Sequence, residues 1–376
     1  MNHFKCYNPS AKNLTEGLAS LKEQLSCSFE KLQRTTFFID ARDAESYQRQ
    51  FSEIATWMEK YFPSALFEVI AQPPVDNSAV AAECFFVSAN TYIECIETSE
   101  VKYHKVHYST HTEIHAFGLN GYESDSFENW SEQAFKKATA VLTNENIDFT
   151  HVVRQWNYIE EIISVHRTEA NEIQNYQVFN DVRSKYYSQC EFKNGYPAAT
   201  GIGTKSGGVS ISFIAIDPKE SVKISAVTNT RQIDAHNYSE QVLVGTACTK
   251  TSPKFERAKI VASSKVATNY ISGTAAIIGE DTIPNEDYAH QTIETLNNID
   301  ILINRENAAV ETLAGNAIKS SMQHLRVYIN KIENAEVVKQ EVFKRYPTVP
   351  VNYVEADVCR DNLLVEIESV MEYLLS

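Results

Sequence analysis

Apolar and polar positions follow one order of predicted elements that occurs twice along the chain. Each half shows a helix with apolar residues three or four positions apart, then a strand, a second helix and two closing strands. In the first half these elements are predicted at residues 129–144, 151–159, 175–187, 196–203 and 209–216. In the second half they are predicted at residues 290–304, 323–332, 336–346, 352–360 and 363–371.

Strands that alternate with helices and end in an antiparallel-looking pair predict an α+β fold, with helices packed on one face of mixed sheets. We therefore expect two tandem units, at residues 61–217 and 218–376. Residues 1–60 are predicted to form a helical extension, because apolar residues form one stripe at Leu18, Leu21, Leu25, Phe29 and Leu32.

The closing strands of the two units align without a gap and differ at one position that matters chemically. Gly203 precedes Ser210 by seven residues, and Cys359 precedes Glu366 by seven residues. The first unit therefore has a serine where the second has a glutamate. This difference predicts an active site in the second unit and a degenerate one in the first.

Glu366 lies in an otherwise apolar strand. Alternate side chains of a strand point to opposite faces, so Glu366 and Glu368 share the face opposite Val365 and Ile367. If that face is enclosed, loss of water raises the pKa of the carboxyl and makes it a proton donor near neutral pH. The same alternation is typical of a half-buried strand with one wet face, so the pattern alone leaves both interpretations open.

Composition narrows the class of protein. The length of 376 residues suits two or three domains, and a hydrophobic content of 43% allows an ample core. The net charge of −15 disfavours nucleic acid and anionic membranes as partners, but a small anionic substrate needs only a few local arginines.

No apolar run approaches the roughly 20 residues of a membrane span, and residues 1–7 lack the apolar core of a signal peptide. Seven cysteines without a Cys-x-x-Cys pair indicate reduced thiols, so we expect a soluble cytoplasmic protein.

Other polar clusters carry weaker signals. His107, His111 and His115 would be too far apart on one strand to converge on zinc, so a solvated strand face is favoured. The glycine-rich run 200–208 lacks the spacing of a phosphate-binding loop and is interpreted as a hairpin turn. Three arginines in segments rich in aromatic and amide groups are candidates for binding an anionic substrate, namely Arg183, Arg231 and Arg257.

Eight segments in the same order resemble the chorismatases, tandem relatives of the YjgF/RidA fold that cleave the enolpyruvyl ether of chorismate. The resemblance covers roughly residues 60–376. The segments are RQWNYI (154–159), NYQxFNxxR (175–183), YPAATGIG (196–203), RQxxAxxY (231–238), PxFxRA (253–258), SGTA (272–275), QTxETLxNI (291–299) and CRxxLLVEIE (359–368).

This resemblance implies two tandem YjgF/RidA-like units and a catalytic acid at Glu366. It also implies that the substrate's carboxylates and ring hydroxyl are held by further side chains, for which the expected set is Tyr158, Arg183, Tyr238, Arg257, Tyr270 and Thr274. Protonation of an enol ether by a carboxyl group requires neither a metal nor an organic cofactor, so none is expected.

Two further residues are implied to set the product. Hydroxybenzoate-forming relatives have Gly in the Ser-Gly-Thr segment and Cys before the closing strand, as Gly273 and Cys359 are here. The expected product is 3-hydroxybenzoate, with 4-hydroxybenzoate as a co-product. The chain departs from the family's pattern at Ser369, in the loop 279–287 and over residues 1–60.

Three alternatives remain open at this stage. A hydrolytic chorismatase would release a dihydroxycyclohexadiene carboxylate instead of an aromatic product. A RidA-like imine deaminase would recruit Arg360, and a small-molecule binder would not need Glu366. The chain is expected to be a monomer or a homotrimer.

Overall fold

The computed structural model describes residues 2–26, 30–122, 126–167, 172–218, 221–239, 251–283 and 287–376. Three sections of the chain repeat one order of elements, β-α-β-α-β-β, and each forms its own sheet. We call them the amino-terminal unit (residues 2–87), the middle unit (92–218) and the carboxyl-terminal unit (223–375).

The amino-terminal unit forms a four-stranded sheet in the order β1-β4-β2-β3. Its elements are β1 (His3–Tyr7), α1 (Leu14–Ser26), β2 (Lys31–Ile39), α2 (Ala44–Tyr61), β3 (Leu66–Ile70) and β4 (Val80–Val87). Strands β2 and β3 are parallel, and β4 is antiparallel to both β1 and β2.

The middle unit has the same core order, β7-β12-β8-β11, extended at one edge by β6 and β5. Its elements are β5 (Tyr92–Glu97), β6 (Lys102–His107), β7 (His111–Gly121), α3 (Phe127–Asn144), β8 (Val152–Glu160), β9 (Val165–Arg167), β10 (Glu172–Gln174), α4 (Asn175–Tyr187), β11 (Ala198–Thr204) and β12 (Val209–Pro218).

The carboxyl-terminal unit repeats the order as β15-β20-β18-β19, extended at the equivalent edge, beside β15, by β14 and β13. Its elements are β13 (Lys223–Val227), β14 (Ala258–Ala262), β15 (Val266–Ala275), β16 (Ile277–Ile278), β17 (Asp281–Thr282), α5 (Tyr288–Ile303), α6 (Ala308–Ala314), β18 (Ala317–Ile329), α7 (Ala335–Arg345), β19 (Val351–Glu355) and β20 (Val365–Leu375).

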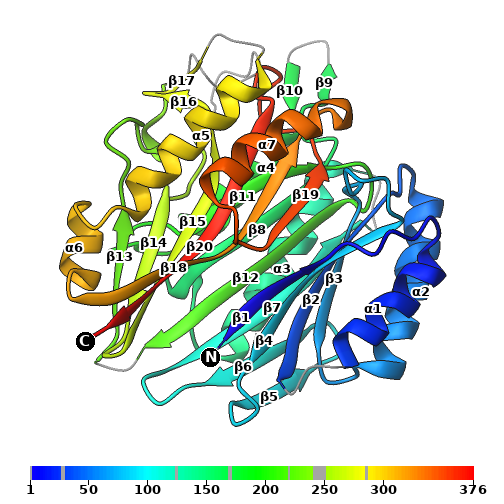
Figure 1. Ribbon diagram of the computed structural model, residues 1–376, viewed down its shortest axis with the longest axis horizontal. Helices are drawn as coiled ribbons and strands as arrows, with labels where there is room; N and C mark the ends of the chain where they lie inside the picture. The colour runs from blue at the N-terminus through cyan, green and yellow to red at the C-terminus, as the bar shows by residue number, and fades with distance from the viewer. Residues whose placement is uncertain are drawn as a thin grey trace.

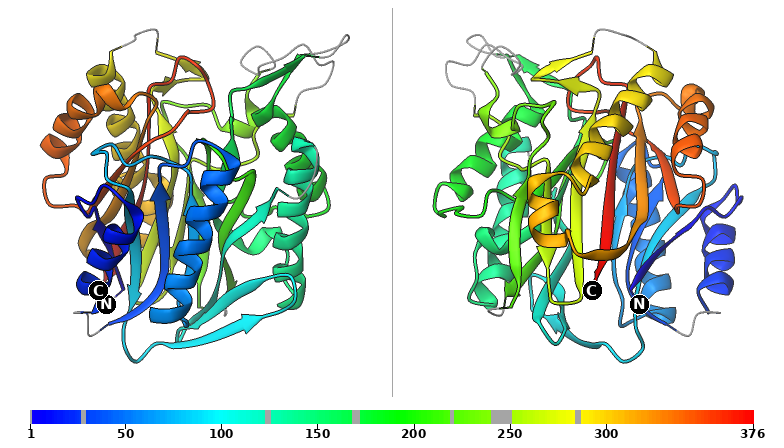
Figure 2. Two further views of the ribbon diagram at one scale, coloured as in Figure 1. Left: turned by 90° about the vertical axis from the view of Figure 1, so that its right-hand side faces the viewer. Right: turned by 60° about the vertical axis from the view of Figure 1, so that its left-hand side comes forward.

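Helices lie on the outside and the three sheets face one another inside, with the chain ends close together (Figures 1 and 2). Each unit has its own apolar core between its helices and its sheet. A fourth core joins the inner faces of all three sheets, to which Phe38, Trp156 and Tyr328 each contribute from a different unit. The predicted α+β class, with helices on one face of mixed sheets, is confirmed.

The amino-terminal section differs from the expected helical extension. Residues 1–60 contain α1 and α2, but also β1 and β2, and β3 and β4 complete their sheet rather than the one that follows. Leu32 lies on β2, and Phe29 lies outside the described residues. Strand β2 escapes detection because four consecutive polar residues, Gln33 to Thr36, are buried in it, so apolar alternation is lost.

Among the described residues, no helix is both long and apolar enough to cross a membrane.

Candidate active site

A pocket with about 710 Å³ of space that no protein atom fills lies where the middle and carboxyl-terminal units meet. The middle unit supplies residues of α4 and β11, and the carboxyl-terminal unit supplies the ends of β15 and β20 with the loop between β19 and β20. The lining residues are Gln174, Tyr176, Gln177, Asn180, Ala199, Gly201, Tyr238, Pro253, Phe255, Arg257, Gly273, Ala275, Ile277, Cys359, Arg360, Leu363 and Glu366.

Glu366 enters this pocket from the second position of β20, where it pairs with Tyr328 on one side and Ala275 on the other. Its residue is only 5% exposed. The pairing of β15 with β20 is irregular between Ile271 and Thr274, and Gly273 lies in that bulge. A Cβ atom at Gly273 would approach Oε1 of Glu366 to 2.1 Å, so only glycine leaves room for the carboxyl group where it is.

The electrostatic environment favours the protonated form of Glu366. Burial and then the negative charge of Glu368 raise its pKa to about 8, while Arg154 and Arg257 act in the opposite direction. None of the described residues forms a hydrogen bond with its carboxyl group. A neutral, desolvated acid that faces a cavity can donate a proton near neutral pH.

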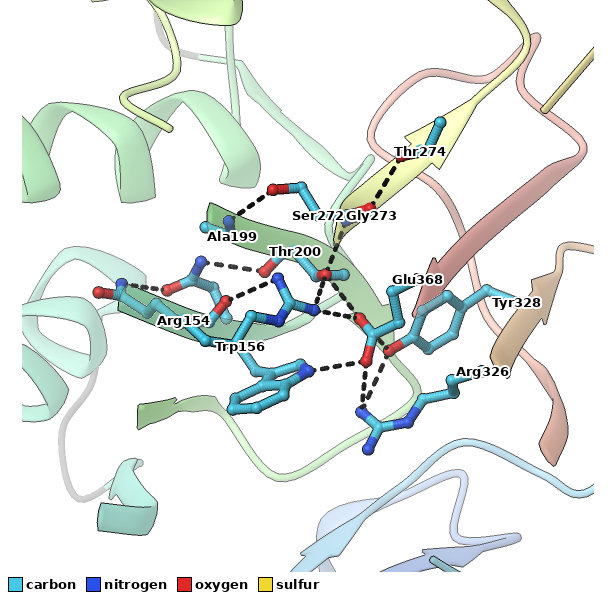
Figure 3. A network of polar contacts seen from close by, with 12 residues as sticks. Arg154, Trp156, Ala199, Thr200, Ser272, Gly273, Thr274, Arg326, Tyr328 and Glu368 are labelled. Atoms are coloured by element: carbon cyan, nitrogen blue, oxygen red, sulfur yellow. Dashed lines mark hydrogen bonds and ion pairs between the residues drawn. The ribbon is translucent and has the colours of Figure 1, made fainter. Parts of the chain in front are cut away.

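Glu368, two residues further on, has the opposite character. Its carboxylate accepts hydrogen bonds from Arg154 (2.8 Å), Trp156 (2.7 Å), Thr200 (2.6 Å) and Tyr328 (3.1 Å), as Figure 3 shows. Arg326 forms an ion pair with it at 3.2 Å. Burial opposes ionisation, but the two arginines and the hydrogen bonds outweigh it and lower the pKa of Glu368 to about 2.

Donors on the far side of the pocket have free hydrogen-bonding capacity. Arg257 is 3% exposed and donates through Nη2 to the hydroxyl of Tyr238 (2.5 Å) and to the carbonyl of Ile233 (2.6 Å). Its Nε is buried and has no partner among the described residues, as is also true of Nδ2 of Asn180 and Nε of Arg183. Buried donors without partners cost free energy unless a ligand pairs with them, and these would suit an anion.

Cys359 lines the pocket as a neutral thiol. Burial and then Glu366 raise its pKa to about 12, although Arg360 and Arg257 act against them. A thiol in this state is a poor nucleophile, so its contribution here is shape and polarity.

The structure does not bring every predicted residue to this pocket. Tyr158 lies in the shared inner core and accepts a hydrogen bond from Nη1 of Arg326 (2.6 Å). Tyr270 faces a different cavity near Glu372, at the opposite end of β15. Thr274 is buried beside Gly273 and donates to the carbonyl of Ser272, and Arg183 lies behind Asn180, to which it donates. The recognised segments contain these residues but do not show in which direction each side chain points.

Three weaker expectations also change. Arg231 is paired with Glu294 outside the pocket. The glycine-rich run connects β11 to β12, but β8 lies between these strands, so they do not form a hairpin. The histidines lie on two strands, β6 and β7, and His104 and His115 are buried rather than solvated.

Several pocket residues were not singled out from the sequence, although they fall within or beside the recognised segments. They are Gln174, Tyr176, Gln177, Asn180 and Phe255. Within the described part of the chain, no three His, Cys, Asp or Glu side chains are grouped so that they could hold a metal ion.

Comparisons with known proteins show which proteins the chain resembles. Residues 91–215 match the family model described as the amino-terminal part of FkbO/Hyg5-like chorismatases. A 3-hydroxybenzoate synthase of Streptomyces hygroscopicus is 29% identical over 235 residues, which are 60% of this chain and 65% of that protein. A chorismatase of the same organism is 28% identical over 245 residues, which are 63% of this chain and 68% of that protein.

The likeness in structure is more extensive than the likeness in sequence. The crystal structure of a chorismatase superposes with a TM-score of 0.70 over 98% of both chains, at 17% identity. At that identity the superposition establishes the fold.

Proposed function

The chain is related to the chorismatases by sequence and shares their fold, and on this premise we propose that it cleaves chorismate into pyruvate and 3-hydroxybenzoate. The observation that carries the proposal is Glu366, a buried carboxyl with a pKa of about 8 that faces a cavity lined by Arg257 and Asn180, each with an unpaired buried donor.

The proposed chemistry begins with proton transfer. Glu366 protonates the terminal methylene carbon of the enolpyruvyl group, which turns the enol ether into an oxocarbenium ion. Cleavage of the bond between the ether oxygen and the ring then releases pyruvate, whose carbonyl oxygen is the former ether oxygen. The oxygen of the neighbouring ring hydroxyl forms the new bond to the ring carbon that pyruvate leaves and gives up its bond to its own carbon, and loss of a ring proton, which restores the acid form of Glu366, yields 3-hydroxybenzoate. Chorismate contains all the atoms of pyruvate and hydroxybenzoate, so the aromatic route consumes no water, whereas the hydrolytic route adds one water molecule.

The substrate's carboxylates need fixed positive partners in the pocket. We assign this role to Arg257, with Tyr238 held against it, and to the amide of Asn180 in front of Arg183. The sequence likewise predicted Arg257, Arg183 and Tyr238. Buried guanidinium donors also stabilise charge that develops as the ether bond breaks.

Gly273 and Cys359 are proposed to select the aromatic product. Gly273 allows Glu366 to stand close to the bulge of β15, and Cys359 adjoins the same carboxyl group. A larger residue at 273 would displace the acid and alter the room beside the ring, where a water molecule would otherwise compete.

The test is incubation of the purified protein with chorismate, followed by a coupled pyruvate assay and chromatography of the ring product. The proposal expects pyruvate and 3-hydroxybenzoate in equal amounts, both lost in Glu366→Gln. A non-aromatic diol with pyruvate would move the assignment to the hydrolytic branch. Release of no Glu366-dependent pyruvate would overturn chorismate cleavage and leave imine deamination, with Arg360 in the pocket, or ligand binding to be tested.

Both a monomer and a homotrimer remain compatible with the proposed reaction.

A further inference from the structure

Thr200 lies close to both Glu366, the proposed acid, and the buried carboxylate of Glu368. It lies on β11 of the middle unit, is 1% exposed, and its hydroxyl contacts three other strands, β8, β15 and β20 (Figure 3). The hydroxyl accepts hydrogen bonds from the backbone N–H of Gly273 (2.9 Å) and from Nη2 of Arg154 (2.6 Å), and donates one to Glu368 (2.6 Å). These three contacts use the full capacity of a hydroxyl group, one donor and two acceptor positions.

Strand β11 holds the bulge of β15 at two consecutive residues. The N–H of Ala199 donates to Oγ of Ser272 (2.9 Å), and the N–H of Gly273 donates to Thr200. The position of Gly273 in turn limits the carboxyl of Glu366, since a Cβ atom at Gly273 would come within 2.1 Å of it. The hydroxyl of Thr200 therefore links the backbone that borders the acid to the carboxylate of Glu368.

We propose that Thr200 is a positioning residue, which holds Glu368 and Arg154 away from Glu366 and fixes the bulge against which Glu366 stands. This role rests on the proposed function. Without the hydroxyl, Nη2 of Arg154 keeps its bond to Glu368 but has an unpaired N–H, which allows the guanidinium to shift toward Glu366, and Glu368 loses one of its four hydrogen-bond donors. The approach of the cation favours the carboxylate form of Glu366.

The groups that face Glu366 come from several elements, and only two of them bond to Thr200. The titratable and charged neighbours are Glu368 on β20, Arg154 on β8, Tyr176 on α4, Tyr238 and Arg257 before β14, and Cys359 and Arg360 before β20. Glu368 and Arg154 are the pair that Thr200 controls.

Two substitutions separate the hydroxyl from the shape of the side chain. Thr200→Val keeps the volume and removes the hydroxyl, whereas Thr200→Ser keeps the hydroxyl. Thr200→Val should lower kcat at least about tenfold, with less effect on KM, because the acid is misplaced. It should also shift the alkaline limb of the kcat profile to lower pH by about half a unit or more. Thr200→Ser should restore both values to near those of the wild type.

The chain offers a matched control. Ser212 accepts a hydrogen bond from the N–H of Gly118 (2.9 Å) and donates one to the buried Glu68 (2.5 Å), so it makes contacts of the same kind away from Glu366. Ser212→Ala should lower the melting temperature about as much as Thr200→Val and leave kcat and the pH profile unchanged.

A second measurement keeps this role distinct from the proposed function. The carboxyl of Glu366 is titrated by ¹³C NMR in glutamate-labelled protein, with Glu366→Gln to assign the signal. A lower midpoint in Thr200→Val supports the role, even if the wild type releases no pyruvate and the proposed function fails. An unchanged midpoint, or a Thr200→Ser variant that is folded but behaves like Thr200→Val, would overturn it.

Discussion

Two interfaces between units of this chain share the placement of a glycine in a β-bulge but differ in their chemistry. Where the middle unit meets the carboxyl-terminal unit, β11 faces a bulge in β15 at Gly273. Where the amino-terminal unit meets the middle unit, β3 faces a bulge in β7 at Gly118, whose Cβ would lie 3.4 Å from the carbonyl of Phe67. In each case the glycine N–H donates to a side-chain hydroxyl that also bonds a buried carboxyl group.

The hydroxyl and the carboxyl group have exchanged strands between the two interfaces. Thr200 on β11 bonds Glu368 on β20, whereas Ser212 on β12 bonds Glu68 on β3. Glu368 is kept ionised by two arginines, while burial raises the pKa of Glu68, which bonds the hydroxyls of Ser212 and Thr36. A buried carboxyl group satisfied by hydrogen bonds is therefore common to both and does not by itself make a catalytic site.

The decisive difference lies two residues earlier on the closing strand. Ser210 pairs with Tyr158 on β8 in the same way that Glu366 pairs with Tyr328 on β18. Of the two, and among the described residues, only the interface between the middle and carboxyl-terminal units therefore places an acid without hydrogen-bond partners beside an ionised carboxylate. That combination leaves a neutral acid available for proton transfer.

The largest expected effect follows from removing the acid at this position. Glu366→Gln should lower turnover of chorismate by about 10²–10⁴-fold, because the proton donor is lost while the shape of the side chain is kept. The coupled pyruvate assay measures it. Ser210→Ala, at the equivalent position of the other interface, is the control and should retain wild-type turnover; loss of activity in both variants would contradict the comparison.

The next largest effect concerns the free energy of unfolding, which should distinguish the buried carboxyl groups of Glu368 and Glu68. Glu368→Gln leaves Arg154 and Arg326 without their shared anion and should cost about 3–5 kcal/mol of unfolding free energy. Glu68→Gln keeps hydroxyl partners and should cost only about 1 kcal/mol. Denaturant unfolding of both variants measures the difference, and equal losses would show that the arginines do not set Glu368 apart.

The pH dependence sharpens the comparison further. Because Glu366 acts when protonated, kcat should be retained below its pKa of about 8 and fall as pH rises through that value. A carboxyl whose pKa is raised on folding contributes stability below its unfolded pKa, and this contribution is lost as pH rises through the folded one. Glu366→Gln should therefore melt at a higher temperature than the wild type at pH 9 but not at pH 4, as calorimetry can test.

The smallest effect is expected at Cys359. Its neutral thiol supplies shape, so Cys359→Ser should change turnover by less than about tenfold but raise the share of non-aromatic product, because a hydroxyl holds water beside the ring. Chromatography of the products measures the ratio. Complete loss of pyruvate release in a folded Cys359→Ser variant would instead point to a direct chemical role for the thiol.

Much of this arrangement was determined by the sequence itself. The periodicity of the two later units, the alternation around Glu366 and the serine at its counterpart are local properties, which short stretches of chain reveal. The recognised segments also contain Arg257, Tyr238 and Cys359, which the structure brings to one pocket. Turn and strand patterns of this kind depend on neighbouring residues and need no knowledge of distant contacts.

Only the tertiary structure decided which of these residues meet. The third copy of the unit remained hidden because β2 buries polar side chains against other units instead of apolar ones. Tyr158 and Tyr270 point away from the pocket, which their segments could not show. The bonds of Glu368 to Thr200 and Arg154 span 168 and 214 positions of sequence. Such contacts exist only once three sheets have packed face to face, because that packing removes the water that would otherwise satisfy each charge separately.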